Sequence, residues 1–164
     1  MEFHGLIHQF PKEIKLLIGI FVLVLSIGFY MGLAFVHETT EGTPIGIEEQ
    51  YLGNENDEDA TVMKFKKKKQ ALITMIHNHV ISMSILFFVL SLLVSITSYN
   101  KNLKKYVMIE PFVSIVVSFG GIYFMWLGMT SLKYIIVVSG MLMTLSFVMA
   151  TFMIISSLFR KSKA

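Results

Sequence analysis

Four long stretches of the chain contain no Asp, Glu, Lys or Arg, and polar segments separate them. These stretches are residues 16–36, 71–100, 111–132 and 134–159. Each has at least 21 residues, and about 20 apolar residues are enough for a helix to cross the hydrocarbon core of a bilayer. The even alternation typical of a membrane β-barrel is absent. The pattern therefore predicts transmembrane helices over residues 14–37, 71–100, 108–132 and 133–159.

The segments outside these helices complete the expected architecture. Residues 1–10 carry apolar side chains at helical spacing before Pro11, which predicts a short interfacial helix. Residues 38–70 form one long polar segment, and a run from 43 to 53 that starts with proline and ends with glycine predicts a short helix over the bundle mouth. We therefore expect an all-α membrane protein with a single domain over 1–164. Its fold would be a four-transmembrane-helix antiparallel bundle with a long extracytoplasmic loop between helices 1 and 2.

The composition supports this class and excludes several others. The chain of 164 residues is 54% apolar and only 15% charged, whereas a soluble domain has about 25% charged residues. It has no cysteine, which excludes disulfides, thiolate metal sites and iron–sulfur clusters. It carries no phosphate-binding loop, dinucleotide fingerprint or hydrolase motif. We therefore expect a protein that contacts membrane lipid, binds no nucleic acid and is not itself an enzyme.

The positions of the basic residues predict the orientation of the bundle. Eight Lys and Arg residues lie on the side that holds the termini and the 101–110 connection, and six lie on the other side. Cytoplasmic segments carry an excess of Lys and Arg. We therefore expect a multi-pass protein of the inner (plasma) membrane with both termini in the cytoplasm.

Small and polar residues mark the expected packing faces, because apolar bulk gains nothing by leaving lipid tails. On the first helix these residues are Gly19, Ser26, Tyr30 and His37, which fall within about 20° of one direction. The other three helices carry similar stripes of serine, glycine and alanine. Gly28 and Gly32 lie off the first stripe, in a small-xxx-small pattern typical of helix contacts. This pair predicts a second contact surface, for another subunit.

Two histidines are the most specific candidates for cofactor chemistry. His37 and His77 fall on the predicted inward stripes at similar heights near the outer interface. Imidazoles from two helices are the usual axial ligands of a membrane haem b, and Tyr30 shares the face of His37. Alternatively, His37, His77 and His79 bind Zn or Cu together with Glu38, although His79 lies about 160° around the helix from His77. A third interpretation is that the histidines only form hydrogen bonds with each other, with Tyr30 or with the loop.

Glu110 is the other candidate. It directly precedes Pro111, which is typical of the first turn of a helix, where a carboxylate is favoured by the helix dipole. In that interpretation it caps the third helix or pairs with Lys104 or Lys105. The alternative is proton or quinone chemistry, since a carboxylate inside a membrane is a functional candidate by default.

Two functions are consistent with these features. The first is a membrane subunit of a bacterial-type redox complex that holds haem between His37 and His77 near the outer surface. The second is a cofactor-free accessory subunit that docks and stabilises a larger membrane complex. In the second case, other subunits would bind the 38–70 loop and the Gly28/Gly32 face.

Overall fold

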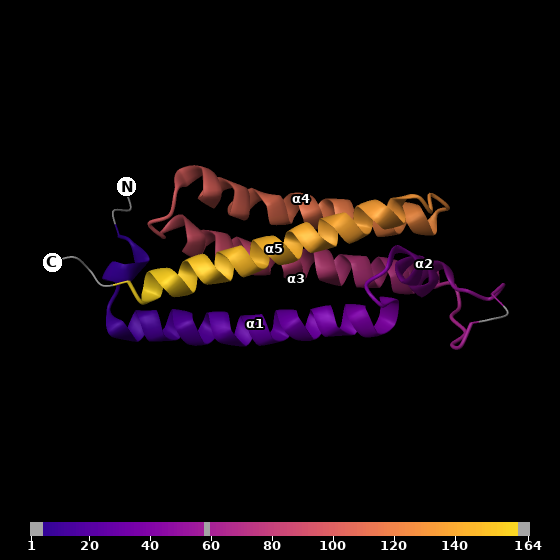
Figure 1. Ribbon diagram of the computed structural model, residues 1–164, viewed down its shortest axis with the longest axis horizontal. Helices are drawn as coiled ribbons and strands as arrows, with labels where there is room; N and C mark the ends of the chain where they lie inside the picture. The colour runs from indigo at the N-terminus through magenta and orange to yellow at the C-terminus, as the bar shows by residue number, and fades with distance from the viewer. Residues whose placement is uncertain (1–4, 58–59, 161–164) are drawn as a thin grey trace.

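The computed structural model describes residues 5–57 and 60–160, and it is helical throughout its regular elements (Figure 1). The elements are the 3-10 turn η1 (Ile7–Gln9) and the helices α1 (Lys12–Thr40), α2 (Pro44–Leu52), α3 (Lys69–Ser95), α4 (Lys101–Trp126) and α5 (Leu132–Leu158). All of these except η1 and α2 are long and apolar enough to cross a membrane. This confirms the prediction of a four-helix membrane protein.

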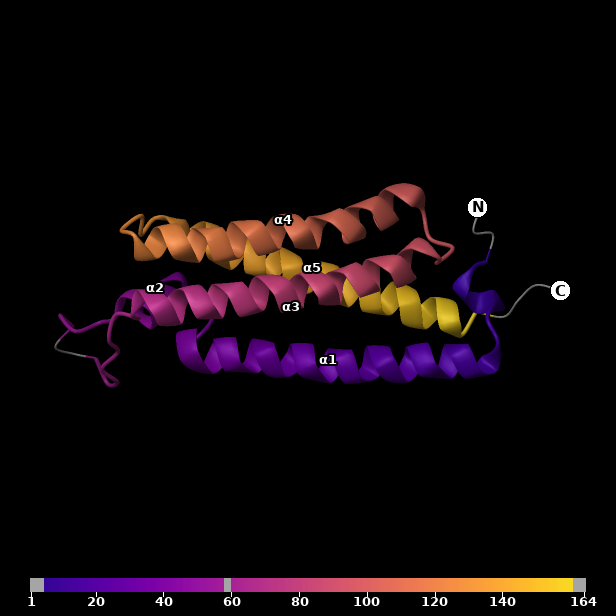
Figure 2. The same cartoon turned by 180° about the vertical axis from the view of Figure 1, so that it is seen from behind.

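The four long helices run antiparallel, and they do not pack equally. α4 packs most extensively against α5 and then against α3. In both views α4 and α1 lie on opposite sides of the layer formed by α3 and α5 (Figures 1 and 2). Only 11% of the most apolar stretch of α1 is buried, against 39% for α4. The bundle is therefore a three-helix core with α1 laid along one side.

Three phenylalanines attach α1 to this core. The rings of Phe29 and Phe147 stack with centroids 3.8 Å apart, and the ring of Phe87 meets both edge-on at 6.4 and 6.3 Å. Aromatic pairs in such geometries add about 0.5–1.5 kcal/mol beyond the area that they bury. On α1, only Val22, Phe29 and Thr40 are buried. These three residues determine which side of α1 faces the core.

Small and polar residues bring α4 and α5 close together, as their spacing predicted. Ser118 and Ser139 are buried and share a hydrogen bond of 2.7 Å. A Cβ atom added to Gly121 would lie 2.9 Å from the Ile136 side chain. Interhelical hydroxyl bonds and close backbone approach are what hold helices together in lipid.

The structure extends the third span beyond its charge-free core. α4 begins at Lys101 rather than at 108, with the Asn100 side chain accepting a hydrogen bond from the Asn102 N–H at 2.8 Å. Consequently the 101–110 segment is not a loop, and Pro111 lies inside the helix. The sequence estimate failed here because it required a span free of charge, whereas lysines at the end of a span extend their charged groups to the interface.

The first residues also differ from the prediction. Met1–His4 of the expected interfacial helix over 1–10 lie outside the described residues, and residues 7–9 form only the single turn η1. Ile7 is fully buried, and its N–H donates to the Ile96 carbonyl at 3.0 Å. This segment therefore closes one end of the bundle, because the bundle offers Ile7 more apolar contact than a membrane surface does.

Candidate functional sites

The structure does not place Tyr30, His37 and Glu38 in the bundle interior. All three are exposed, and Tyr30 is 69% exposed. The His37 ring lies beside the turn that follows α1, with Nδ1 3.8 Å from the position of a Cβ on Gly42. Stacking of Phe29 rotates α1 by about 60° relative to the predicted stripe. The expectation that the polar stripe of α1 faces inward therefore fails for Tyr30 and His37, whereas Gly19 and Ser26 of the same stripe are half-buried.

The two histidines of α3 reverse their expected roles. His77 is exposed and forms no hydrogen bond or ring contact with any described residue. The ring of His79, in contrast, lies 5.4 Å from the ring of Phe119 on α4, and its Nδ1 is 2.9 Å from the Met75 carbonyl oxygen. α3 thus directs His79 rather than His77 towards its neighbour, because its contact face is centred on α4.

The structure brings no cluster of metal-ligating side chains together at these positions. Among the described residues, no group of three or more His, Asp or Glu side chains is close enough to hold a metal ion. His37, His77, His79 and Glu38 therefore do not form such a group, and Tyr30 and His37 both lie on the exposed side of α1. Binding of haem, Zn or Cu by these residues stays a prediction for spectroscopy.

Glu110 lies well inside α4 and links it to α5. It follows Lys101 by nine residues, or about 13 Å of helix. The hydroxyl of Ser114, one turn further along α4, donates to Glu110 Oε1, and the hydroxyl of Ser146 on α5 donates to Oε2. Ser114 and Ser146 are both buried. Glu110 is therefore the centre of a polar clamp between two membrane-spanning helices.

This geometry corrects the capping interpretation of Glu110. Because α4 begins at Lys101, Glu110 is far from the helix N-terminus and its free N–H groups. The ammonium of Lys104 donates to the Ser95 and Thr97 carbonyls, each at 3.0 Å, instead of pairing with Glu110. Lys105 and Glu110 both line an open, shallow face of α4, where Glu110 is half-buried. An intramembrane carboxylate in such a position is a candidate for function.

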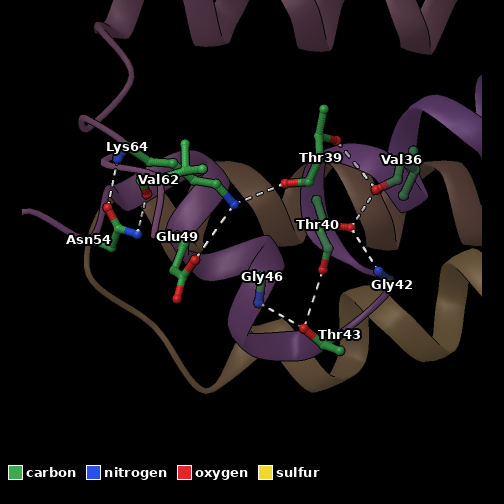
Figure 3. Close-up of polar contacts among 10 residues, drawn as sticks. All are labelled: Val36, Thr39, Thr40, Gly42, Thr43, Gly46, Glu49, Asn54, Val62 and Lys64. Atoms are coloured by element: carbon green, nitrogen blue, oxygen red, sulfur yellow. Dashed lines mark hydrogen bonds and ion pairs between the residues drawn. The ribbon is translucent and has the colours of Figure 1, made fainter. Parts of the chain in front are cut away.

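At the opposite end, α2 covers the bundle as the Thr43–Gly53 pattern predicted. Thr43 caps the helix, with its Oγ1 accepting from the Gly46 N–H at 3.0 Å and donating to the Thr40 carbonyl at 3.2 Å (Figure 3). Proline follows at the first helical position, and Gly53 ends the helix with a φ of 84°. Buried Ile47 faces the bundle. The prediction of a short helix here is confirmed.

Polar contacts hold this segment together and attach it to the long helices. Within the segment, Asn54 donates to the Val62 carbonyl at 3.1 Å and accepts from the Lys64 N–H at 2.6 Å (Figure 3). The Lys64 ammonium donates to the Thr39 carbonyl of α1 at 3.1 Å and lies 3.6 Å from Glu49. Glu48 pairs with Lys133 of α5 at 2.5 Å. The described residues 41–57 and 60–68 are thus attached to the bundle at two points, and we call them the cap below.

Aromatic residues meet the basic end of the cap. The Trp126 indole N–H donates to the Lys67 carbonyl at 2.8 Å, and the Lys66 ammonium lies 4.8 Å from the Trp126 ring centre. Burial raises the pKa of Tyr51 to about 12, because a low-dielectric environment disfavours the phenolate. Trp side chains concentrate at membrane–water interfaces. Trp126 and the adjacent lysines therefore mark the membrane boundary at this end.

The sequence interpretation missed one polar residue, Asn78 on α3. Its side chain is exposed and lines a groove with Thr74 and His79. The signal was present in the sequence as a carboxamide eight residues into the charge-free stretch 71–100, where polar side chains are rare.

The fold and these sites define a multi-pass helical membrane protein without strands in the described part of the chain. A family model described as a transmembrane helical domain matches residues 41–164. The chain belongs to this family. The match covers the cap and α3 to α5, and it leaves α1 outside. No curated protein and no solved structure matches the chain.

Proposed function

We propose that this protein is a cofactor-free accessory subunit that docks onto a larger complex of the inner membrane and stabilises it. Both termini lie in the cytoplasm in this proposal, and the cap lies outside. Its docking surfaces are the Gly28/Gly32 face of α1 and the cap. The family match supports only the class, an integral membrane helical protein, and the accessory role is what we add to it.

The observation that carries the proposal is the loose attachment of α1. This helix is tied down at both ends, by the segment around η1 and by the cap, but between them it contacts the core along one narrow stripe. A Cβ atom added to either Gly28 or Gly32 would have no neighbouring atom within 4 Å. Glycine costs a helix about 1 kcal/mol relative to alanine, and in lipid such a pair allows another backbone to approach closely.

The cap supports the same role in a second way. Its ion pairs and the Asn54 bridge give the outer end a definite shape, and its acidic and basic parts are both displayed on the surface. A rigid surface loses less entropy on binding than a loose loop does. The cap is therefore suited to contact the extramembrane part of a partner.

The redox alternative has less support. Haem held between His37 and His77 would be enclosed by the bundle only if both imidazoles faced its interior, and both side chains are exposed. An absorption spectrum tests this directly. We expect the purified protein to lack a Soret band, and a Soret band that disappears in both the His37→Ala and His77→Ala variants would favour the redox function instead.

The docking proposal is tested by comparing two leucine substitutions in native membranes. Gly32→Leu fills the open face of α1, whereas Gly140→Leu fills an equally open position on α5. After mild solubilisation, we expect the wild type and Gly140→Leu to migrate in the same large assembly, and Gly32→Leu to migrate free of that assembly. Identical migration of all three proteins in the large assembly would refute docking through α1. Migration of the wild type as the isolated chain would refute the accessory function itself.

A further inference from the structure

One face of α3 carries exposed side chains at a regular spacing of four and three residues. They are Thr74, Asn78, Ile81, Ile85, Phe88 and Leu92, and we call them the α3 seam. Ile81, Ile85, Phe88 and Leu92 are each about half exposed, from 49% to 60%. This spacing is that of the a and d positions of a heptad repeat, with Asn78, Ile85 and Leu92 at a. It is the pattern by which two helices pack in a left-handed pair.

No helix of the described chain covers this seam. α1 meets α3 at Phe87, which lies about 140° around the helix from the centre of the seam. Buried Leu90 and Val94 also lie away from it, on the core side of α3. Figure 2 shows α3 running across the front of the bundle with no helix before it. The seam therefore faces the membrane.

Asn78 makes lipid alone an unsuitable neighbour for this face. The boundary at this end is marked by Trp126 and Lys67, and Asn78 follows Lys69, the first residue of α3, by nine residues, or about 13 Å of helix. It is thus placed in the hydrocarbon, whose half-thickness is about 15 Å. Its side chain forms no hydrogen bond with any described residue. Hydrocarbon offers a carboxamide no donor or acceptor, and polar groups there are paired with protein partners.

We propose that the α3 seam binds the α3 seam of a second copy of this chain, so that the protein forms a symmetric dimer in the membrane. Two copies inserted with the same topology have parallel α3 helices. In a parallel pair, each a position meets the same position of the other helix. Asn78 then faces the partner's Asn78, and a carboxamide is complementary to itself because it both donates and accepts.

A second copy explains the details of the seam better than an unrelated helix does. The polar pair at one a position sets the register, since a shift along the seam would separate the two carboxamides and place one of them against an isoleucine. The apolar positions below it, Ile81 to Leu92, supply continuous packing in the other half of the membrane. This dimer uses α3 and not α1, so it is independent of the proposed docking function.

Disulfide cross-linking tests the dimer cleanly, because the chain has no native cysteine. Thr74 and Ile73 are neighbours at the same depth and are both exposed, but only Thr74 belongs to the seam. In membranes treated with an oxidant, we expect Thr74→Cys and Ile85→Cys to form cross-linked dimers and Ile73→Cys to stay monomeric. Cross-linking of Ile73→Cys as strongly as Thr74→Cys, or of neither seam variant, would overturn the proposal.

Asn78 is tested by comparing Asn78→Val with Asn78→Gln, which keeps the carboxamide. Dimer dissociation is measured by energy transfer between labelled copies in detergent micelles, with helix content checked by circular dichroism. We expect Asn78→Val to weaken the dimer about fivefold to thirtyfold and Asn78→Gln to weaken it less. Equal dimerisation of the wild type and Asn78→Val would show that Asn78 does not hold the pair. If Asn78→Val fails to fold, the cysteine comparison decides by itself.

Discussion

The contact between α2 and the end of α1 is tight enough for a single methyl group to disrupt it. Gly46 is buried in the first turn of α2, directly over the last residue of α1. A Cβ atom at Gly46 would lie 2.0 Å from the Thr40 carbonyl oxygen and 2.6 Å from the Thr40 carbonyl carbon. These are backbone atoms, so no side-chain rotation relieves the clash. Gly46→Ala must therefore lift α2 away from α1.

The structure gives the expected size of this effect. Lifting α2 exposes Ile47, which is worth about 1.5–3 kcal/mol when fully buried. It also breaks the hydrogen bond from the Thr43 hydroxyl to the Thr40 carbonyl, which is worth about 1 kcal/mol. Alanine returns about 1 kcal/mol through its better helix propensity. We therefore expect Gly46→Ala to destabilise the cap by about 1.5–3 kcal/mol.

Hydrogen exchange measured by mass spectrometry on the α2 peptide tests this value. A loss of about 2 kcal/mol raises the exchange rate of α2 amides about 30-fold, while the amides of α4 and α5 keep their protection. Gly140→Ala is the matched control, because a Cβ there meets nothing within 4 Å. In this variant we expect the α2 amides to exchange no faster than in the wild type. Exchange of α2 in Gly46→Ala at the wild-type rate would refute the reasoning.

Three further predictions concern other parts of the molecule. Burial raises the pKa of Tyr51 to about 12, so the stability that the buried neutral phenol contributes is complete below pH 10 and is lost as the pH rises through 12. The ultraviolet titration of the wild type minus that of Tyr51→Phe should therefore have its midpoint near pH 12. A midpoint near pH 10 would contradict burial of Tyr51. Glu110→Leu should lower the free energy of unfolding by about 2 kcal/mol, since the buried Ser146 hydroxyl loses its acceptor. Ser146→Ala should then lower the free energy of unfolding much less in the Glu110→Leu protein than in the wild type. Equal losses in both proteins, measured by denaturant unfolding, would show that Glu110 and Ser146 do not interact. For the orientation, Glu55→Cys should react with an impermeant maleimide in intact cells and Asn102→Cys only after permeabilisation, whereas the reverse order would place the termini outside.

The hydropathy pattern determined much of the architecture without any tertiary information. Charge-free stretches of sufficient length must be helical in a membrane, because lipid cannot satisfy an open backbone. The short helix α2 was equally local, since a threonine cap, a following proline and a terminal glycine specify its two ends. The inward serines of α4 and α5 followed from the rule that small and polar residues form helix contacts in lipid.

The rotation of each helix about its own axis was decided only by the tertiary structure. Stacking of Phe29 against Phe147, which is distant in the sequence, left Tyr30 and His37 on the exposed side of α1. Glu110 changed from an expected cap to an interhelical clamp because α4 begins at Lys101, with its charged first turns packed beside α3. Local spacing states which residues share a face. Which face is buried depends on the shape of the neighbouring helices, and that information is not contained in any single segment.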